Sequence, residues 1–148
     1  MSTISVRLDE GYKTSICIRN HTVIADEHIQ DGGTDIGPTP MEMLLGTAGA
    51  CVAVTTKAYA LRKGWPLEGV SVELEMERVR REDDPTFSGD APFFHRIHEH
   101  IHFDGPLTDE QKARLMVIAG KCPVHATLAN PVFFDQQLVE TEPLTPQG

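Results

Sequence analysis

Two of the three cysteines, Cys51 and Cys122, lie in surroundings where a thiol could do chemistry. The thiolate is the nucleophilic form, so a reactive cysteine needs a nearby cation or a helix N-terminus. Pro123 suits the first position of a helix, which places Cys122 at the N-cap, where the helix dipole favours a thiolate. His125 can lie close to that sulfur. A helix cap with an incidental sulfur fits the same short motif, so both interpretations stay open.

Cys51 lies within a predicted helix and follows a run of small residues at positions 46–50. Small side chains let a ligand approach closely, but they also let two helices pack together without any chemistry. A buried structural cysteine is therefore the alternative interpretation. Activation of Cys51 would require a cation brought by the fold. Cys17, on a predicted strand, has no partner in the pattern and is interpreted as incidental. The residues that share the helix face of Cys51 are Leu44, Ala48, Val52 and Thr55.

A row of histidines offers a second kind of chemistry. His98, His100 and His102 alternate along a predicted strand, and His95 precedes them. Alternating histidines can bind zinc or copper. The same residues can instead form cross-strand pairs with Glu73, Glu75 and Glu77 on a solvent-exposed face. No Cys/His spacing of a closed tetrahedral site is present, so we favour the solvent face and expect no metal and no bound cofactor.

The cysteines must be positioned by a small set of helices and strands. Alternation predicts a hairpin from residues 4–8 and 12–19 with Gly11 between them, and a short third strand near 22–25. After a turn-rich loop at 31–39, a long helix starts at Pro40. Its N-terminus carries the capping box of Thr39 and Glu42, and its end is marked by Arg62, Lys63 and Gly64.

The second half of the chain repeats the change from strand to helix. Alternating residues predict strands at 69–80 and 94–103, separated by a charged loop at 81–92. A second helix opens at Thr108, with Gln111 in a capping box, and ends near Gly120. A short helical turn after Cys122 and a last strand at 132–139 complete an α+β fold.

Length and charge limit the kind of protein this can be. With 148 residues the chain is predicted to form one domain, 1–148. Its formal net charge of -9 disfavours nucleic acid and anionic membranes as partners. The N-terminus has no signal-like apolar segment, and the uncharged stretch 43–56 is too short to span a bilayer. We therefore expect a cytoplasmic protein whose cysteines do not form a structural disulfide framework.

Over nearly its whole length the sequence resembles the OsmC/Ohr family (osmotically inducible protein C and organic hydroperoxide resistance proteins), in its OsmC-like branch. The order of predicted elements fits that family as well. No single motif is diagnostic, but the combination in this order is specific. The residues that carry the resemblance are His21, 25–27, 32–33, 37–40, 42–45, 49–51, Leu107, 111–119 and 122–125.

The resemblance implies an α+β, OsmC-like fold that forms an intertwined homodimer with the central helices packed inside. It further implies that Cys51 is the peroxidatic and Cys122 the resolving cysteine of a thiol peroxidase in oxidative-stress defence. The thiolate would attack an organic hydroperoxide and become a sulfenic acid, and Cys122 would condense with it to a disulfide. An external dithiol, such as a lipoyl group, would reduce that disulfide.

The chain departs from the family where the thiolate would be activated. In the Ohr branch a glutamate lies ten residues before the peroxidatic cysteine and holds an arginine against it, but that position is Met41 here. Glu42 is adjacent but turned by about 100° around the helix. Arg19 is our candidate for the arginine, with Arg7 as the second choice. The alternative function is a non-catalytic small-molecule-binding or redox-sensing protein, which a turnover assay distinguishes from an enzyme.

Overall fold

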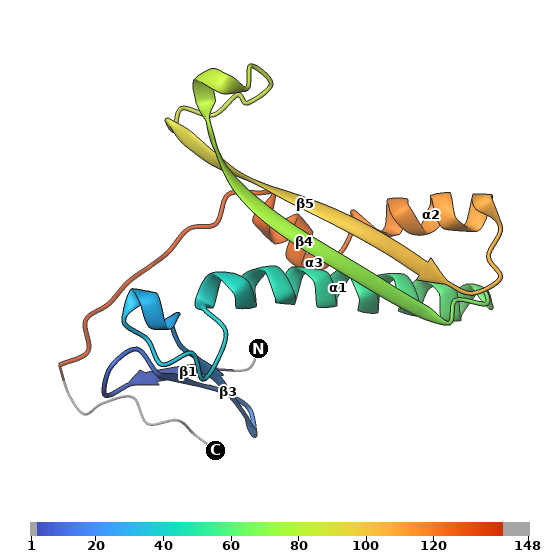
Figure 1. Ribbon diagram of the computed structural model, residues 1–148. Coiled ribbons are helices and arrows are strands. Elements are labelled where there is room, and N and C mark those ends of the chain that lie inside the picture. Colours follow the sequence, from blue (N-terminus) through green and yellow to red (C-terminus); the bar gives the residue numbers. More distant parts are fainter. Residues whose placement is uncertain (1–2, 141–148) are drawn as a thin grey trace. The chain divides into compact units, whose positions relative to one another are not determined.

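The computed structural model describes residues 3–140 and has an α+β architecture (Figure 1). The elements in chain order are β1 (Ile4–Leu8), β2 (Thr14–Ile18), β3 (His21–Ala25), the 3-10 turn η1 (Ile29–Asp31), α1 (Pro40–Lys63), β4 (Gly69–Arg80), the 3-10 turn η2 (Arg81–Asp83), β5 (Phe93–Asp104), α2 (Asp109–Ala119) and α3 (Pro123–Leu128). The predicted α+β class and the order of these elements are confirmed. The described residues group into two compact units, one formed by 3–44 and 133–140, the other by 45–132.

The first unit contains an antiparallel sheet with the strand order β1-β2-β3. Gly11, at φ +60°, lies in the connection between β1 and β2, where its left-handed backbone costs a glycine little. The pairing places Val6 opposite Ile16 and Ile16 opposite Val23. The predicted hairpin and third strand are therefore confirmed.

A buried carboxylate organises the loop that leads from β3 into the long helix. Asp26, 1% exposed, accepts hydrogen bonds from the backbone N–H groups of Glu27 (2.8 Å), Thr34 (3.0 Å) and Ile36 (3.4 Å) and from the Thr34 hydroxyl. These bonds, led by the Thr34 hydroxyl, lower the pKa of Asp26 to about 2 against the opposing effect of burial. The loop turns tightly enough that a Cβ at Gly33 would lie 1.9 Å from the Glu27 carbonyl oxygen.

The start and end of α1 follow the predicted signals. The Thr39 N–H donates to the Glu42 carboxylate (2.7 Å), and the Glu42 N–H donates to the Thr39 hydroxyl (3.2 Å), which completes the capping box. Gly64, at φ +66°, ends the helix after Arg62 and Lys63.

The length of α1 corrects one expectation. With 24 residues and a mean hydropathy of 1.3 over its most apolar 18-residue window, this helix meets the length and composition of a membrane span. The prediction that no segment can span a bilayer is based on the uncharged stretch 43–56 alone, whereas the helix is longer. A core helix of a globular protein passes the same test, and here α1 buries Ala48, Val52, Thr56 and Ala60.

In the second unit, β4 and β5 form a long antiparallel hairpin that lies alongside α1 (Figure 1). Gly49 permits this packing, because a Cβ there would lie 2.6 Å from the Leu74 side chain of β4. Leu115 of α2, fully buried, joins Ala60 of α1 and Phe103 of β5 in one core cluster. Helix α2 begins with the predicted capping box at Thr108.

The predicted last strand is wrong for this chain. Residues 131–140 have no regular secondary structure, although their sequence alternates in the manner of a strand. Phe133, Phe134 and Leu138 are 89%, 83% and 87% exposed. A strand requires a neighbour for its backbone hydrogen bonds, and within residues 3–140 no strand pairs with this segment.

The Asp26 network predicts a particular pH dependence of stability. Because folding lowers the Asp26 pKa from 3.8 to about 2, its contribution is complete above about pH 4 and is lost as the pH falls through about 2. We expect Asp26→Asn to lower the urea midpoint of unfolding at neutral pH, and the gap to the wild type to close toward pH 2. Asp31→Asn, an exposed carboxylate of the same loop, is the control and should show no such gap. A gap independent of pH would contradict the assignment.

Candidate functional site

Cys51 lies in the middle of α1 and is half-buried. Its sulfur is 4.0 Å from the hydroxyl oxygen of Thr55, one turn further along the helix. The side chain packs against a core cluster formed by Val52, Ala119 and Cys122. The predicted inward-facing position of Cys51 is therefore confirmed.

Cys122 is the N-cap of α3, as the Cys-Pro motif predicts. Pro123 is the first residue of the helix, and the Cys122 sulfur accepts a hydrogen bond from the His125 N–H at 3.2 Å. The side chain is 0% exposed. The local geometry could be predicted correctly because the cap depends only on neighbouring residues.

The cap favours a thiolate as expected, but burial of Cys122 outweighs its effect. Burial raises the pKa of the Cys122 thiol, because a buried thiolate loses its hydration, and the neighbouring Cys51 raises it further. The N–H groups of His125 and Val124 act in the opposite direction but do not outweigh these effects. Cys122 therefore keeps its proton more firmly than an ordinary cysteine.

The structure brings the two predicted cysteines together. Cys51 and Cys122 contact the same core cluster, and a hydrogen bond between their thiols contributes to the raised pKa of Cys122. Both thiols are free. Cys51 is half-buried and Cys122 is fully buried, so the two neighbouring thiols differ in how easily solvent reaches them.

Four other residues considered from the sequence, Arg19, Glu42, Met41 and Cys17, lie in the N-terminal unit. Arg19 is exposed in the turn between β2 and β3, at φ +55°, and its role in activating Cys51 stays a prediction. Glu42 is engaged in the capping box and lies 3.4 Å from a ring nitrogen of His28; the Thr39 N–H is the main reason its pKa is lowered. Met41 is exposed. The sulfur of Cys17 lies 3.9 Å from the Thr22 hydroxyl on the adjacent strand.

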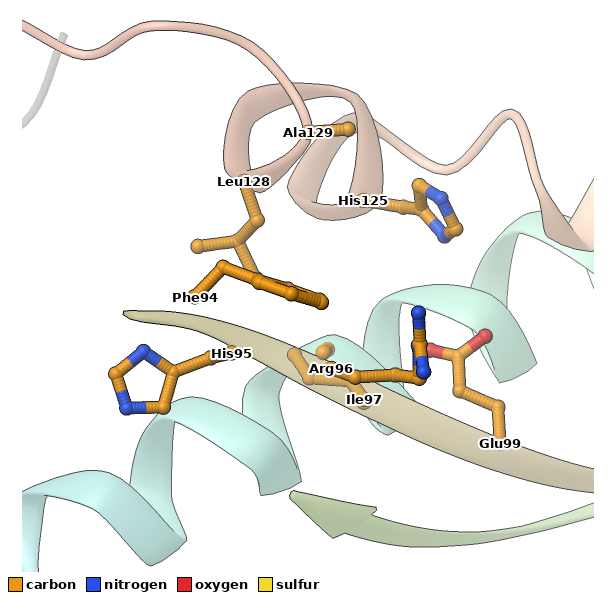
Figure 2. A pocket seen from close by; sticks show the side chains of 9 residues that line it. Phe94, His95, Arg96, Ile97, Glu99, His125, Leu128 and Ala129 are labelled. Carbon is orange, nitrogen blue, oxygen red and sulfur yellow. The ribbon is translucent and has the colours of Figure 1, made fainter. Parts of the chain in front are cut away.

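A pocket of about 420 Å³ is lined by residues of α1, β5 and α3, and neither Cys51 nor Cys122 is among them. Ala48, one turn before Cys51 on α1, and His125, three residues after Cys122, both line it. Figure 2 shows Leu128 of α3 above Phe94 of β5, and the imidazole of His125 above Arg96 and Glu99. The lining residues are Ala48, Phe94, His95, Arg96, Ile97, Glu99, His125, Leu128 and Ala129.

Two residues of the pocket wall are held by the loop after β4. The Arg96 guanidinium, 5.3 Å from the Phe94 ring centroid, forms an ion pair with Asp84. Hydrogen bonds from the Thr86 hydroxyl and then from Arg96 lower the pKa of Asp84 to about 2. Phe87 stacks on Phe94 with ring centroids 4.4 Å apart. Sequence reasoning missed this pocket, because the charged, turn-rich loop gave no sign of which strand residues it would contact.

The histidine row lies on the exposed face of the β4–β5 hairpin, which is the solvent-exposed position that the sequence favours. His98 pairs with Glu75 and His100 with Glu73 across the strands, whereas His102 stands opposite Ser71. A His98 ring nitrogen also lies 3.0 Å from the Glu77 carboxylate. Within residues 3–140, no three His, Cys, Asp or Glu side chains converge as a metal site would require.

The fold agrees with comparisons to known proteins. The family model of the OsmC-like protein matches residues 32–136, and the chain therefore belongs to the OsmC-like family. By sequence, no curated protein matches it.

Several solved structures share the fold at low sequence identity. An OsmC-like protein from Mycoplasma pneumoniae has a TM-score of 0.70 and 21% identity, with 87% of each chain covered. An organic hydroperoxide resistance protein from Elizabethkingia anophelis has a TM-score of 0.61 and 17% identity, covering 88% of this chain and 91% of its own. The organic hydroperoxide resistance protein OhrB of Bacillus subtilis has a TM-score of 0.58 and 14% identity, covering 86% and 89%.

The contact between the thiols predicts the product of mild oxidation. We expect a peroxide to link Cys51 to Cys122 within one chain, and peptide mapping under non-reducing conditions checks this. Cys17, on a different unit, should remain a free thiol. Before oxidation, Cys122 should react with iodoacetamide more slowly than Cys17, because burial keeps it protonated and covered. A main disulfide that contains Cys17 would disprove the pairing.

Proposed function

We propose that the protein is a cysteine-based peroxidase that reduces organic hydroperoxides through Cys51 and Cys122. The observation that carries the proposal is the contact of a half-buried thiol with a fully buried one. A partly apolar pocket is lined by Ala48 and His125, which lie three residues from Cys51 and Cys122 respectively. The names of the Elizabethkingia anophelis and Bacillus subtilis structures support a role in hydroperoxide chemistry. The proposal extends that role to this chain.

The reaction proceeds in three balanced steps. The Cys51 thiol gives up its proton to solvent, and the resulting thiolate attacks the outer oxygen of the hydroperoxide. The O–O bond breaks, and the leaving alkoxide takes up one proton from solvent and departs as an alcohol. The resulting Cys51 sulfenic acid condenses with the Cys122 thiol, which forms the disulfide and releases water. An external dithiol, such as a lipoyl group, then donates two electrons and two protons and restores both thiols.

The two cysteines suit different steps because their surroundings differ. Cys51 is partly exposed, so a peroxide can reach its sulfur, whereas Cys122 is covered and keeps its proton. A protonated, buried Cys122 does not compete for the peroxide and is in place when the sulfenic acid forms. The cation that activates Cys51 is proposed to be Arg19, and the His125 side chain lies in the pocket where the alcohol leaves. Free thiols of this kind fit a reducing, cytoplasmic compartment.

We expect Cys51→Ser to abolish hydroperoxide turnover with a dithiol, because a serine hydroxyl is not ionised at neutral pH and does not attack the O–O bond. Cys17→Ser should retain full activity. Sustained consumption of peroxide by the wild type distinguishes an enzyme from a redox sensor, which would stop after one equivalent. Equal loss of activity in both variants, with both still folded, would mean that Cys51 is not the nucleophile.

The apolar pocket wall predicts a preference for hydroperoxides with an alkyl tail. Burying each methylene contributes about 0.8 kcal/mol, so a polar side chain at position 128 that leaves about two methylenes of the tail in water should slow such a substrate by about tenfold. We expect Leu128→Asn to lower the second-order rate of Cys51 oxidation by a fatty-acid hydroperoxide and to leave the rate with hydrogen peroxide unchanged. Val117→Asn, an exposed apolar residue of α2 outside the pocket, is the matched control. If wild-type rates were equal for all peroxides, the pocket would not bind the tail.

We further propose a homodimer, in which a second copy covers apolar surface that one chain leaves exposed. Val54 and Leu61 on α1 are 68% and 67% exposed beside a groove of about 450 Å³. Exposed apolar patches of this kind mark interaction sites, and a second copy offers the same patch in return. The groove is lined by Ala53, Val54, Lys57, Ala58, Leu61, Glu68, Gly69 and Val70.

Light scattering at micromolar concentration should therefore give the mass of two chains. Leu61→Glu places a charge on the proposed interface and should shift the mass toward one chain. Val117→Glu changes an exposed position of α2 outside the proposed interface and should leave the dimer intact. A wild-type mass of one chain would contradict the homodimer but not the peroxidase.

A further inference from the structure

Three cations surround one aromatic ring where the end of α1 meets α2. The Arg62 guanidinium carbon and the Lys63 nitrogen each lie 5.7 Å from the centroid of the Tyr59 ring, and the Arg114 guanidinium carbon lies 5.6 Å from it. The Nε–H of Arg114 also donates to the Tyr59 hydroxyl oxygen at 3.1 Å. The ring faces attract the cations, but the cations repel one another.

These cations lack the carboxylate partners that other arginines of the chain have. Within residues 3–140, none of Arg62, Lys63 and Arg114 forms an ion pair, whereas the arginines at 7, 80, 81 and 96 each pair with an aspartate or glutamate. The chain has 22 acidic residues and only 13 basic ones, so unpaired cations at one place stand out. The site therefore gathers three cations that have no ion-pair partner among the described residues.

Two of the cations, Lys63 and Arg114, border an open cavity of about 540 Å³. Trp65 packs edge-to-face against Tyr59, with ring centroids 5.5 Å apart, so two aromatic rings form part of the wall. Thr108 and Gln111 are occupied with each other in the α2 capping box. Glu110 is the single carboxylate in the lining. The lining residues are Tyr59, Lys63, Trp65, Thr108, Glu110, Gln111 and Arg114.

We propose that this cavity binds a small organic molecule that carries a phosphate or carboxylate group. The Lys63 and Arg114 side chains supply charged donors for an oxyanion, and the Tyr59 hydroxyl, which accepts from Arg114, still has its own proton to donate. The aromatic rings offer an apolar surface for the rest of the ligand. A cavity of this volume lies in the range of small-molecule sites, whereas an acidic protein partner would not need a concave surface.

The electrostatics of Tyr59 agree with this assignment. The hydrogen bond from Arg114, and then the charges of Arg114, Lys63 and Arg62, lower the pKa of the Tyr59 phenol, although burial acts the other way. A field that favours a phenolate also favours a bound oxyanion in the same place.

Trp65 provides a direct measurement, because it is the only tryptophan in the chain. Pyrophosphate and citrate are titrated separately into the purified protein at constant ionic strength, with chloride as the balancing anion, while Trp65 fluorescence is recorded. We expect a saturable change with at least one probe at millimolar concentration or below. Pyrophosphate and citrate distinguish a phosphate from a carboxylate ligand. A change that follows ionic strength alone, or no change with either probe, would overturn the proposal.

Lys63 and Arg114 are exposed, so replacing either with a neutral residue should not disturb folding, and a change in binding can be assigned to the lost charge. Arg114→Gln and Lys63→Gln should each weaken the binding of the probe by roughly tenfold or more, the usual consequence of losing one charged hydrogen-bond donor. Lys121→Gln, an exposed lysine outside the cavity, removes the same charge and should bind normally. Tyr59→Phe retains every cation and should weaken binding through the lost hydroxyl donor.

Two further outcomes would reject the small-molecule site. Equal weakening in Arg114→Gln and Lys121→Gln would show that only net charge matters. A response of Trp65 to an oligo-glutamate peptide, without a response to either small anion, would assign the surface to an acidic polypeptide instead. The cavity residues are separate from the cysteines, so peroxide turnover should be unchanged in Lys63→Gln.

Discussion

The packing of α1 against β4 and α3 sets Cys51 beside Cys122. A Cβ at position 49 would lie 2.6 Å from Cδ1 of Leu74, so any residue larger than glycine there would force the Leu74 side chain to move. On the next turn, the same packing buries Val52 and sets Cys51 against the cluster that contains Cys122. The small residues before Cys51 thus have a structural reason, packing of a helix on a strand, and the chemistry of the site depends on it.

Burial and helix capping act in opposite directions on Cys122, and burial prevails. A cap of a six-residue helix supplies two N–H groups to the sulfur, but a fully covered thiolate loses the solvation it would have in water. A thiol that stays protonated is a poor first nucleophile, whatever motif surrounds it. The difference between Cys51 and Cys122 therefore comes from their depth in the fold rather than from their local sequence, which is why sequence reasoning could place the N-cap but not its effect.

The sequence predicted features that depend on neighbouring residues and failed on those that depend on distant ones. Both capping boxes, the end of α1 at Gly64 and the alternation of β4 are local, and the structure confirms each of them. The segment 131–140 has the composition of a strand but no strand beside it, and alternation alone cannot reveal whether a neighbour exists. The pocket forms where residues of β5 contact α3 and the loop around Asp84. These segments are distant in sequence, and a periodic pattern of residues does not predict which of them will be in contact.

The charge balance of the pocket bears on which hydroperoxides it can take. Within the described residues, Arg96 is the one arginine in the lining, and its guanidinium is already paired with Asp84, whose side chain is only 13% exposed. Glu99 adds a negative charge to the same wall. An arginine paired in this way attracts a substrate carboxylate less than a free one would, because the nearby aspartate offsets its field. In the proposed peroxidase, recognition of the substrate would therefore rest on Phe94, Ile97 and Leu128, that is, on the shape and length of an apolar tail.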